Sequence, residues 1–176
     1  MGMKILVTGG VRSGKSWHAE SLLATAPSVS YVAPGPTAAE DPDPDWVARI
    51  EAHQVRRSTT WTTVETRDLV SALRLDGPVL VDCLGTWLTA TIDSHEMWEA
   101  SSLEVTAMVD AVLADVVDVL GTRDEVVLVT NEVGWGVVPS HRSGRLFRDL
   151  LGRVNQRVAT ACDEVHLVVA GRVLRL

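Results

Sequence analysis

The chain has 176 residues, a length typical of one domain, and 46% of the residues are hydrophobic while 22% are charged. This composition excludes a disordered, collagen-like or low-complexity protein. Sixteen lysines and arginines against 23 aspartates and glutamates give a formal net charge of −7. We therefore expect a single domain over residues 1–176 and no nucleic-acid partner, so an anionic ligand must be bound by a local group of residues.

The cysteines and the apolar runs indicate the compartment. Cys83 and Cys162 lie far apart and have the spacing of neither a disulfide framework nor a metal site. The apolar run near the N-terminus is too short for a secretory signal, and no run is long enough to span a membrane. These features predict a cytoplasmic protein without a membrane span.

Predicted strands and helices alternate along the chain. The first half contains a strand at 5–7, a helix from 16 to 23, a strand at 29–33, a helix at 46–55 with Asp45 as its N-cap, and a strand at 61–65. The second half contains a strand at 79–82, a helix at 103–120, a strand at 126–130, a helix at 143–161, and a strand at 164–170 with a hairpin partner at 172–176. This order predicts an α/β fold with a mostly parallel sheet, helices on both faces, and functional residues at the carboxyl ends of the strands.

The strongest motif lies between the first predicted strand and the first predicted helix. Residues 9–16 read Gly-Gly-Val-Arg-Ser-Gly-Lys-Ser and fit the pattern G-x4-G-K-[ST] of a phosphate-binding loop, or P-loop. In such a loop the backbone N–H groups surround phosphates, Lys15 reaches the outer phosphates, and the Ser16 hydroxyl can bind Mg²⁺. A chance glycine turn is the alternative, and the flanking strand and helix argue against it. We predict that the nucleotide is contacted by Gly9, Gly10, Val11, Arg12, Ser13, Gly14, Lys15 and Ser16.

Asp82 is a candidate for the metal site. It ends the apolar run at 79–81, which is typical of a strand buried on both faces. P-loop proteins place at such a strand end the carboxylate that holds Mg²⁺, directly or through water. We therefore predict Mg²⁺ as the cofactor, bound by Ser16 and Asp82. The alternative is an aspartate that only caps a turn or a helix.

His53 lies among arginines on its predicted helix. Arg49, Arg56 and Arg57 are at positions i−4, i+3 and i+4, so their guanidinium groups can share a face with the imidazole. Such arginines can bind a polyphosphate while a neutral imidazole acts as nucleophile or base. We expect the arginines to lower the pKa of His53 and keep it neutral. Periodicity alone favours the alternative, a solvated basic face with an incidental histidine.

A second candidate site follows the predicted strand at 126–130. Asn131 and Glu132 precede the turn Gly134-Trp135-Gly136, whose glycines permit a close approach of a ligand and whose tryptophan offers a flat stacking surface. The remaining histidines have no ligand-like spacing, and we interpret them as structural or surface residues: His18, His95, His141 and His166.

Set in order, these motifs resemble the bifunctional adenosylcobinamide kinase/adenosylcobinamide-phosphate guanylyltransferase family of cobalamin biosynthesis. The most specific runs are Asn-Glu-Val-Gly-Trp-Gly at 131–136 and Gly-Arg-Val-Asn-Gln-Arg at 152–157. The P-loop and the run Arg-Ile-Glu-Ala-His-Gln-Val-Arg-Arg at 49–57 add to the resemblance. It spans nearly the whole chain and implies a RecA-like P-loop NTPase.

The resemblance implies two reactions and a set of site residues. The family phosphorylates the aminopropanol hydroxyl of adenosylcobinamide with ATP or GTP, then transfers GMP from GTP to that phosphate through a guanylyl-histidine. The histidine of the family falls on His53, which reverses the interpretation from periodicity. A homo-oligomer, specifically a trimer, is also implied. Beyond the P-loop, the nucleotide contacts of the family fall on Ala33, Pro34, Gly35, Gln54, Val55, Arg56, Arg57, Glu65 and Asp82.

Two other functions stay open. A small-molecule kinase would use the P-loop and Asp82 without a covalent intermediate, and a nucleotide-gated regulator would catalyse no reaction. Incubation of the protein with α-labelled GTP and Mg²⁺ distinguishes the kinase from the guanylyltransferase, because only the guanylyltransferase becomes covalently labelled. A regulator needs a switch segment or an apolar partner surface, and the sequence indicates neither.

Overall fold

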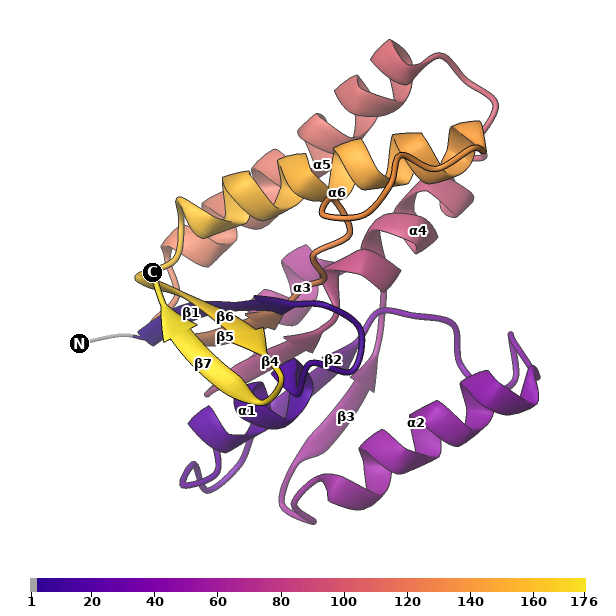
Figure 1. Ribbon diagram of the computed structural model, residues 1–176. Helices are drawn as coiled ribbons and strands as arrows, with labels where there is room; N and C mark the ends of the chain where they lie inside the picture. Colours follow the sequence, from indigo (N-terminus) through magenta and orange to yellow (C-terminus); the bar gives the residue numbers. More distant parts are fainter. Residues whose placement is uncertain (1–2) are drawn as a thin grey trace.

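A computed structural model describes residues 3–176, which form a seven-stranded sheet with helices on both faces (Figure 1). The elements in chain order are β1 (Met3–Gly9), α1 (Lys15–Leu22), β2 (Ser30–Ala33), α2 (Pro44–Arg56), β3 (Thr62–Glu65), α3 (Leu69–Leu73), β4 (Val79–Asp82), α4 (Leu84–Ser94), α5 (Ser102–Gly121), β5 (Glu125–Val129), α6 (Arg142–Ala159), β6 (Glu164–Val169) and β7 (Arg172–Arg175). Within these residues, none of the helices combines the length and apolar character needed to cross a membrane.

The order of the strands determines which loops meet. It is β3-β2-β4-β5-β1-β6-β7, and all neighbours are parallel except β6 and β7, which form an antiparallel hairpin. Without the outer strands β3 and β7, the order is that of RecA-like P-loop proteins, with β5 between the P-loop strand β1 and β4. The predicted fold class is confirmed. Parallel strands bring their carboxyl ends to one edge of the sheet, where the P-loop and Asp82 both lie.

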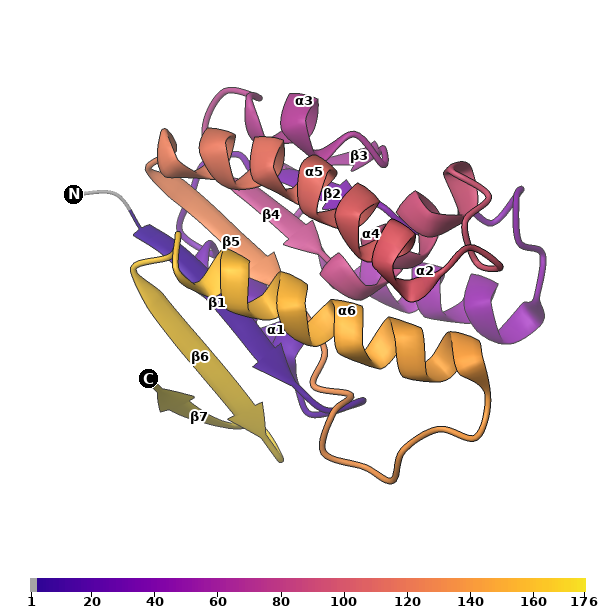
Figure 2. The same cartoon turned by 90° about the horizontal axis from the view of Figure 1, so that it is seen from above.

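Alternate residues of the central strands face different helices. Leu6, Val81 and Leu128 pack against α3, α4, α5 and α6, which Figure 2 shows in front of one face of the sheet. Residues one position away, such as Ile5 and Leu80, pack on the opposite face with α1. Burial on both faces explains why these strands read as unbroken apolar runs.

The helix α2 differs from the others because none of its residues is buried. Figure 1 shows it apart from the helices that cover the sheet. The N-cap predicted at Asp45 is wrong: Asp43 caps the helix, and its side chain accepts hydrogen bonds from the N–H groups of Asp45 and Trp46. Pro44 occupies the first helical position, where its missing N–H costs nothing.

Two helices were not expected from the sequence. The helix α3 has only five residues, too few for a visible period. The helix α4 has eleven residues, of which seven are buried, including a glycine and a threonine. Because it is packed among α5, α6 and the sheet, it shows no clear polar and apolar stripes, and periodicity does not reveal it.

A substitution at the end of β1 tests the packing beneath the P-loop. A Cβ at Gly9 would lie 2.4 Å from the carbonyl oxygen of Val168, which belongs to the neighbouring strand and cannot turn away. We predict that Gly9→Ala lowers the free energy of unfolding by about 1–3 kcal/mol. Gly10→Ala is the matched control, since a Cβ there meets nothing within 4 Å. Urea unfolding measures both, and equal stabilities would contradict the packing described.

Candidate active site

The P-loop at residues 9–16 joins β1 to the first turn of α1. Arg12 and Gly14 adopt positive φ angles of 56° and 96°, and the N–H of Ser13 donates to the carbonyl of Gly10 at 3.3 Å. Left-handed residues in a tight turn are typical of backbone that binds anions. One wall of a cavity, here called the P-loop cavity, is formed by Arg12, Ser13, Gly14, Lys15 and Ser16.

The Lys15 side chain shows that this cavity suits an anion. Lys15 is 6% exposed, and its ammonium donates to the carbonyl of Gly10 at 3.0 Å. Burial lowers the pKa of Lys15, and the carboxylate of Asp82 opposes that shift. The buried hydroxyl of Ser13 finds no hydrogen-bond partner among residues 3–176. A phosphate would supply both the negative charge and the acceptor that these groups lack.

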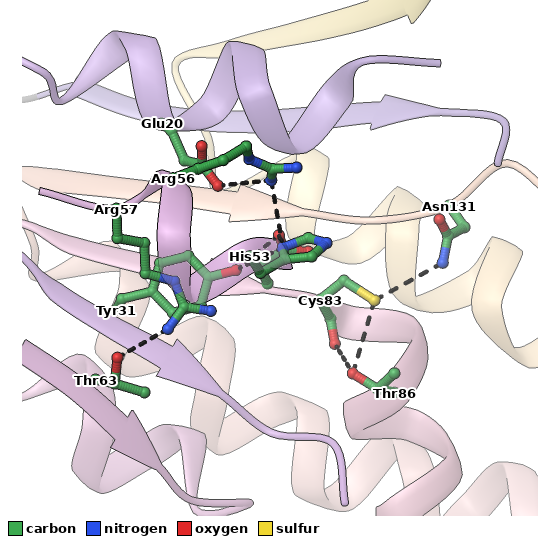
Figure 3. Close-up of polar contacts among 10 residues, drawn as sticks. Glu20, Tyr31, His53, Arg56, Arg57, Thr63, Cys83, Thr86 and Asn131 are labelled. Carbon is green, nitrogen blue, oxygen red and sulfur yellow. Dashed lines mark hydrogen bonds and ion pairs between the residues drawn. The ribbon is translucent and has the colours of Figure 1, made fainter. Parts of the chain in front are cut away.

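The opposite wall of the P-loop cavity is α2, through Arg49, His53 and Arg56. Arg56 pairs with Glu20 of α1 at 3.0 Å, which ties α2 to the helix that follows the P-loop (Figure 3). The expectation that Arg57 shares this face is wrong. Arg57 is the C-cap of α2, and its guanidinium lies 3.4 Å from the ring centre of Tyr31.

The imidazole of His53 has three polar neighbours at Nδ1. Tyr31 Oη lies 3.4 Å away, Arg56 Nη2 3.5 Å and Asp82 Oδ2 3.6 Å. In the part of the chain that the structure describes, Nε2 makes no hydrogen bond and no ion pair. Burial lowers the pKa of His53, the arginines lower it further, and Asp82 and Glu20 oppose the shift. The predicted direction is confirmed, but burial is the larger cause.

Tyr31 connects the imidazole to Asp82. Its hydroxyl donates to Asp82 Oδ2 at 2.9 Å. Burial and the neighbouring carboxylate raise the pKa of Tyr31, so the phenol keeps the proton that it donates. A tyrosine that donates to Asp82 can accept from Nδ1–H of His53, which is consistent with a neutral imidazole whose free lone pair is on Nε2.

A second cavity, here called the base cavity, lies on the other side of His53. Arg49 and His53 line both cavities. Six of the predicted nucleotide contacts line the base cavity: Ala33, Gly35, Gln54, Arg57, Glu65 and Asp82. The structure adds lining residues that the sequence did not indicate as site residues: Tyr31, Trp46, Ile50, Thr63, Cys83 and Thr86.

Some predicted residues lie outside both cavities. Five predicted nucleotide contacts line neither, namely Gly9, Gly10, Val11, Pro34 and Val55, and Val55 is 86% exposed. Of the second candidate site, Asn131 lines the base cavity, whereas Glu132 accepts from the hydroxyl of Thr8 at 2.8 Å. Trp135 lines neither cavity and is exposed to solvent. Asn131 and His53 thus line the same cavity, whereas the predicted stacking surface of Trp135 lies outside it.

Tyr31 is the clearest functional candidate that the sequence analysis missed. It is the only tyrosine of the chain, and it is 1% exposed within β2. Because buried tyrosine hydroxyls usually find a hydrogen-bond partner, a single tyrosine in an apolar strand is itself a signal. Its partner belongs to another strand, so only the strand order identifies Asp82 as that partner.

Comparison with known proteins decides the family. The sequence model of the family described as cobinamide kinase / cobinamide phosphate guanyltransferase matches residues 5–176. The chain belongs to this family. The bifunctional adenosylcobalamin biosynthesis protein CobU of Salmonella typhimurium is 42% identical, with 96% of this chain and 97% of that protein covered. CobU of Escherichia coli is 40% identical with the same coverage, and CobP of Pseudomonas aeruginosa is 34% identical, with 96% and 94% covered.

Membership in the cobinamide kinase / cobinamide phosphate guanyltransferase family confirms the resemblance read from the motifs. The match runs through both the P-loop and α2, so it includes the walls of both cavities. His53 lies at the border between them, together with Arg49. The site therefore places an imidazole between the P-loop cavity and a separate cavity.

Removal of the tyrosine hydroxyl tests the network around Asp82. Tyr31→Phe leaves a nearly buried carboxylate with one donor fewer and opens no cavity. We predict a loss of about 1–2 kcal/mol in the free energy of unfolding, measured with urea at neutral pH. Thr63→Val is the control because it removes an exposed hydroxyl that accepts from Arg57. A loss no larger than that of Thr63→Val would contradict the role assigned to Tyr31.

Proposed function

We propose that this protein phosphorylates the aminopropanol hydroxyl of adenosylcobinamide and then transfers GMP from GTP to the new phosphate. The observation that carries the proposal is the position of His53 between the P-loop cavity and the base cavity. A triphosphate bound by the P-loop, with its nucleoside in the base cavity, has its α-phosphorus beside the imidazole. Family membership supports both reactions.

The phosphates and Mg²⁺ have suitable partners in this arrangement. Lys15, Arg49 and Arg56 supply positive charge around the P-loop cavity. The Ser16 hydroxyl and the Asp82 carboxylate offer oxygen ligands, which Mg²⁺ prefers. No cluster of three metal-binding side chains occurs within residues 3–176, so this donor set fits an ion that also takes ligands from nucleotide phosphates. Bound there, Mg²⁺ would neutralise charge on the phosphates.

The kinase reaction needs positioning rather than a protein nucleophile. The hydroxyl oxygen of the acceptor attacks the γ-phosphorus of ATP or GTP, the bond to the bridging oxygen breaks, and the hydroxyl proton is released. Lys15 would stabilise the charge that develops on the leaving nucleoside diphosphate. His53 is not required for this step.

The homotrimer implied by the family resemblance stays a prediction, which the mass of the assembly in solution tests.

The guanylyl transfer uses His53 in two displacements. Nε2 attacks the α-phosphorus of GTP, an N–P bond forms, and the bond to the bridging oxygen breaks as pyrophosphate leaves. The imidazole then carries a positive charge with its proton on Nδ1, where the carboxylate of Asp82 lies 3.6 Å away. A phosphate oxygen of adenosylcobinamide phosphate attacks the same phosphorus, the N–P bond breaks, and His53 returns to its neutral form.

Replacing His53 separates the two reactions. We predict that His53→Ala loses covalent labelling by α-labelled GTP and lowers guanylyl transfer by several orders of magnitude, because the covalent route is gone. Phosphorylation of adenosylcobinamide persists at a reduced rate. His141→Ala, which changes an exposed histidine outside both cavities, is the control.

Two results would contradict this assignment. Full labelling of His53→Ala would place the adduct on another residue. An absence of labelling in the unaltered protein, with phosphorylation of adenosylcobinamide intact, would instead favour a kinase without a covalent intermediate. Circular dichroism of each variant establishes that it is folded.

Glu65 lines the base cavity and would make it prefer guanine over adenine. A carboxylate accepts two hydrogen bonds from N1–H and the 2-amino group of guanine, whereas adenine has no such pair of donors. We predict that Glu65→Gln raises the KM for GTP in the labelling reaction about tenfold or more and reduces the preference for GTP over ITP, which lacks the 2-amino group. A variant with an unchanged GTP-to-ITP ratio would show that Glu65 does not contact the base.

A further inference from the structure

We propose that a third cavity, next to the base cavity, binds the corrin ring of adenosylcobinamide; this inference rests on the proposed function. This cavity, here called the acceptor cavity, lies where α2, α4 and α6 come together. Its lining includes Trp46, Thr86, Thr89, Asp93, Asn131 and Phe147. The guanylyl-transfer mechanism uses none of these side chains.

The position of the acceptor cavity suits a second substrate. It shares Pro36, Trp46, Thr86 and Asn131 with the base cavity, so one layer of side chains separates the two. It shares no lining residue with the P-loop cavity. A ring bound there can send its side arm across the shared layer toward His53 while the triphosphate stays on the P-loop. Both substrates can therefore be bound at once, as the kinase reaction requires.

The shared layer is held in place by close contacts. The indole N–H of Trp46 donates to the carbonyl of Pro36 at 3.0 Å. A Cβ at Gly35 would lie 3.2 Å from Trp46 Cζ2, and a Cβ at Gly85 would lie 3.0 Å from Asn131 Nδ2. The two glycines thus allow Trp46 and Asn131 to lie directly against the backbone.

The lining matches the chemistry of a corrin ring. Cobinamide has an apolar ring, carboxamide groups around its rim, and a cobalt ion that gives it positive charge. Trp46 and Phe147 offer apolar surface, and Phe147 is the only phenylalanine of the chain. Carboxamides can exchange hydrogen bonds with the neutral polar side chains of Thr86, Thr89 and Asn131.

The charges of the acceptor cavity disfavour a second nucleotide as its occupant. Asp41 and Asp93 present carboxylates, which attract a cation and repel phosphates. Arg67 is the one cationic side chain among the lining residues, and its guanidinium pairs with Glu40 at 2.9 Å. Its lining residues include no P-loop residue and a single arginine, whereas the P-loop cavity is lined by three arginines, Arg12, Arg49 and Arg56.

A bulky residue at position 89 tests the proposal. Thr89 lies within α4, and its hydroxyl donates to the carbonyl of Gly85, four residues earlier, at 3.2 Å. Thr106 of α5 is half-buried like Thr89 and makes the same kind of bond to Ser102 at 2.7 Å, but it lies outside the acceptor cavity. We compare Thr89→Trp with the matched control Thr106→Trp. Equilibrium dialysis with adenosylcobinamide, followed by the visible absorbance of the ring, gives the Kd.

The expected result is a Kd at least tenfold higher for Thr89→Trp and unchanged for Thr106→Trp. Labelling by α-labelled GTP needs no acceptor and should proceed at the same rate in both variants. An unchanged Kd in Thr89→Trp would overturn the proposal, as would an equal rise in Thr106→Trp. Should Thr89→Trp fail to fold, Phe147→Leu is used in its place with a rise of at least threefold expected, and an unchanged Kd there overturns the proposal.

The dialysis also distinguishes this proposal from the proposed function. If the unaltered protein binds adenosylcobinamide but is never labelled by GTP, the covalent mechanism fails and the acceptor cavity stands. If the protein is labelled and Thr89→Trp binds the ring normally, the cavity assignment fails and the mechanism stands.

Discussion

The positions of the polar side chains in the site depend on the nearly buried carboxylate of Asp82. Its side chain is 9% exposed at the end of β4, a strand buried on both faces. A carboxylate removed from water needs hydrogen-bond donors or cations around it. Tyr31 donates to it, His53 lies 3.6 Å away, and its charge opposes the effect of burial on the pKa of Lys15. The carboxylate at the end of one strand therefore interacts with both Lys15 of the P-loop and His53 of α2.

The helix α2, which has no buried residue, is held in place by side-chain contacts with its neighbours. The ion pair between Arg56 and Glu20 is partly exposed, and such pairs contribute little on their own. The stacking of Arg57 on Tyr31 and the contact of Trp46 with Gly35 add apolar surface.

In the strand order, β5 separates β1 from β4, a spacing of about 10 Å. That spacing leaves room for a phosphate chain between the P-loop and Asp82.

The sequence predicts those features that depend on local pattern. The P-loop, the apolar strands and the long helix at 102–121 follow from motif, hydrophobic runs and period, and the structure contains all of them. The helix α4 escapes prediction because it is buried on several sides. The partnership of Tyr31 with Asp82 escapes because it joins two strands and depends on their order. Periodicity predicts the basic face of α2, but it does not predict that the Arg57 side chain lies outside this face and stacks on Tyr31.

The central claim is that Nε2 of His53 receives the guanylyl group, and the most direct test is to locate that group on the unaltered protein. The protein is incubated with GTP and Mg²⁺, digested at alkaline pH to preserve an N–P bond, and analysed by tandem mass spectrometry. The account predicts one guanylyl group, on the peptide that contains His53, which is lost when adenosylcobinamide phosphate is added. A guanylyl group on any other residue, or one that the acceptor does not remove, would contradict it.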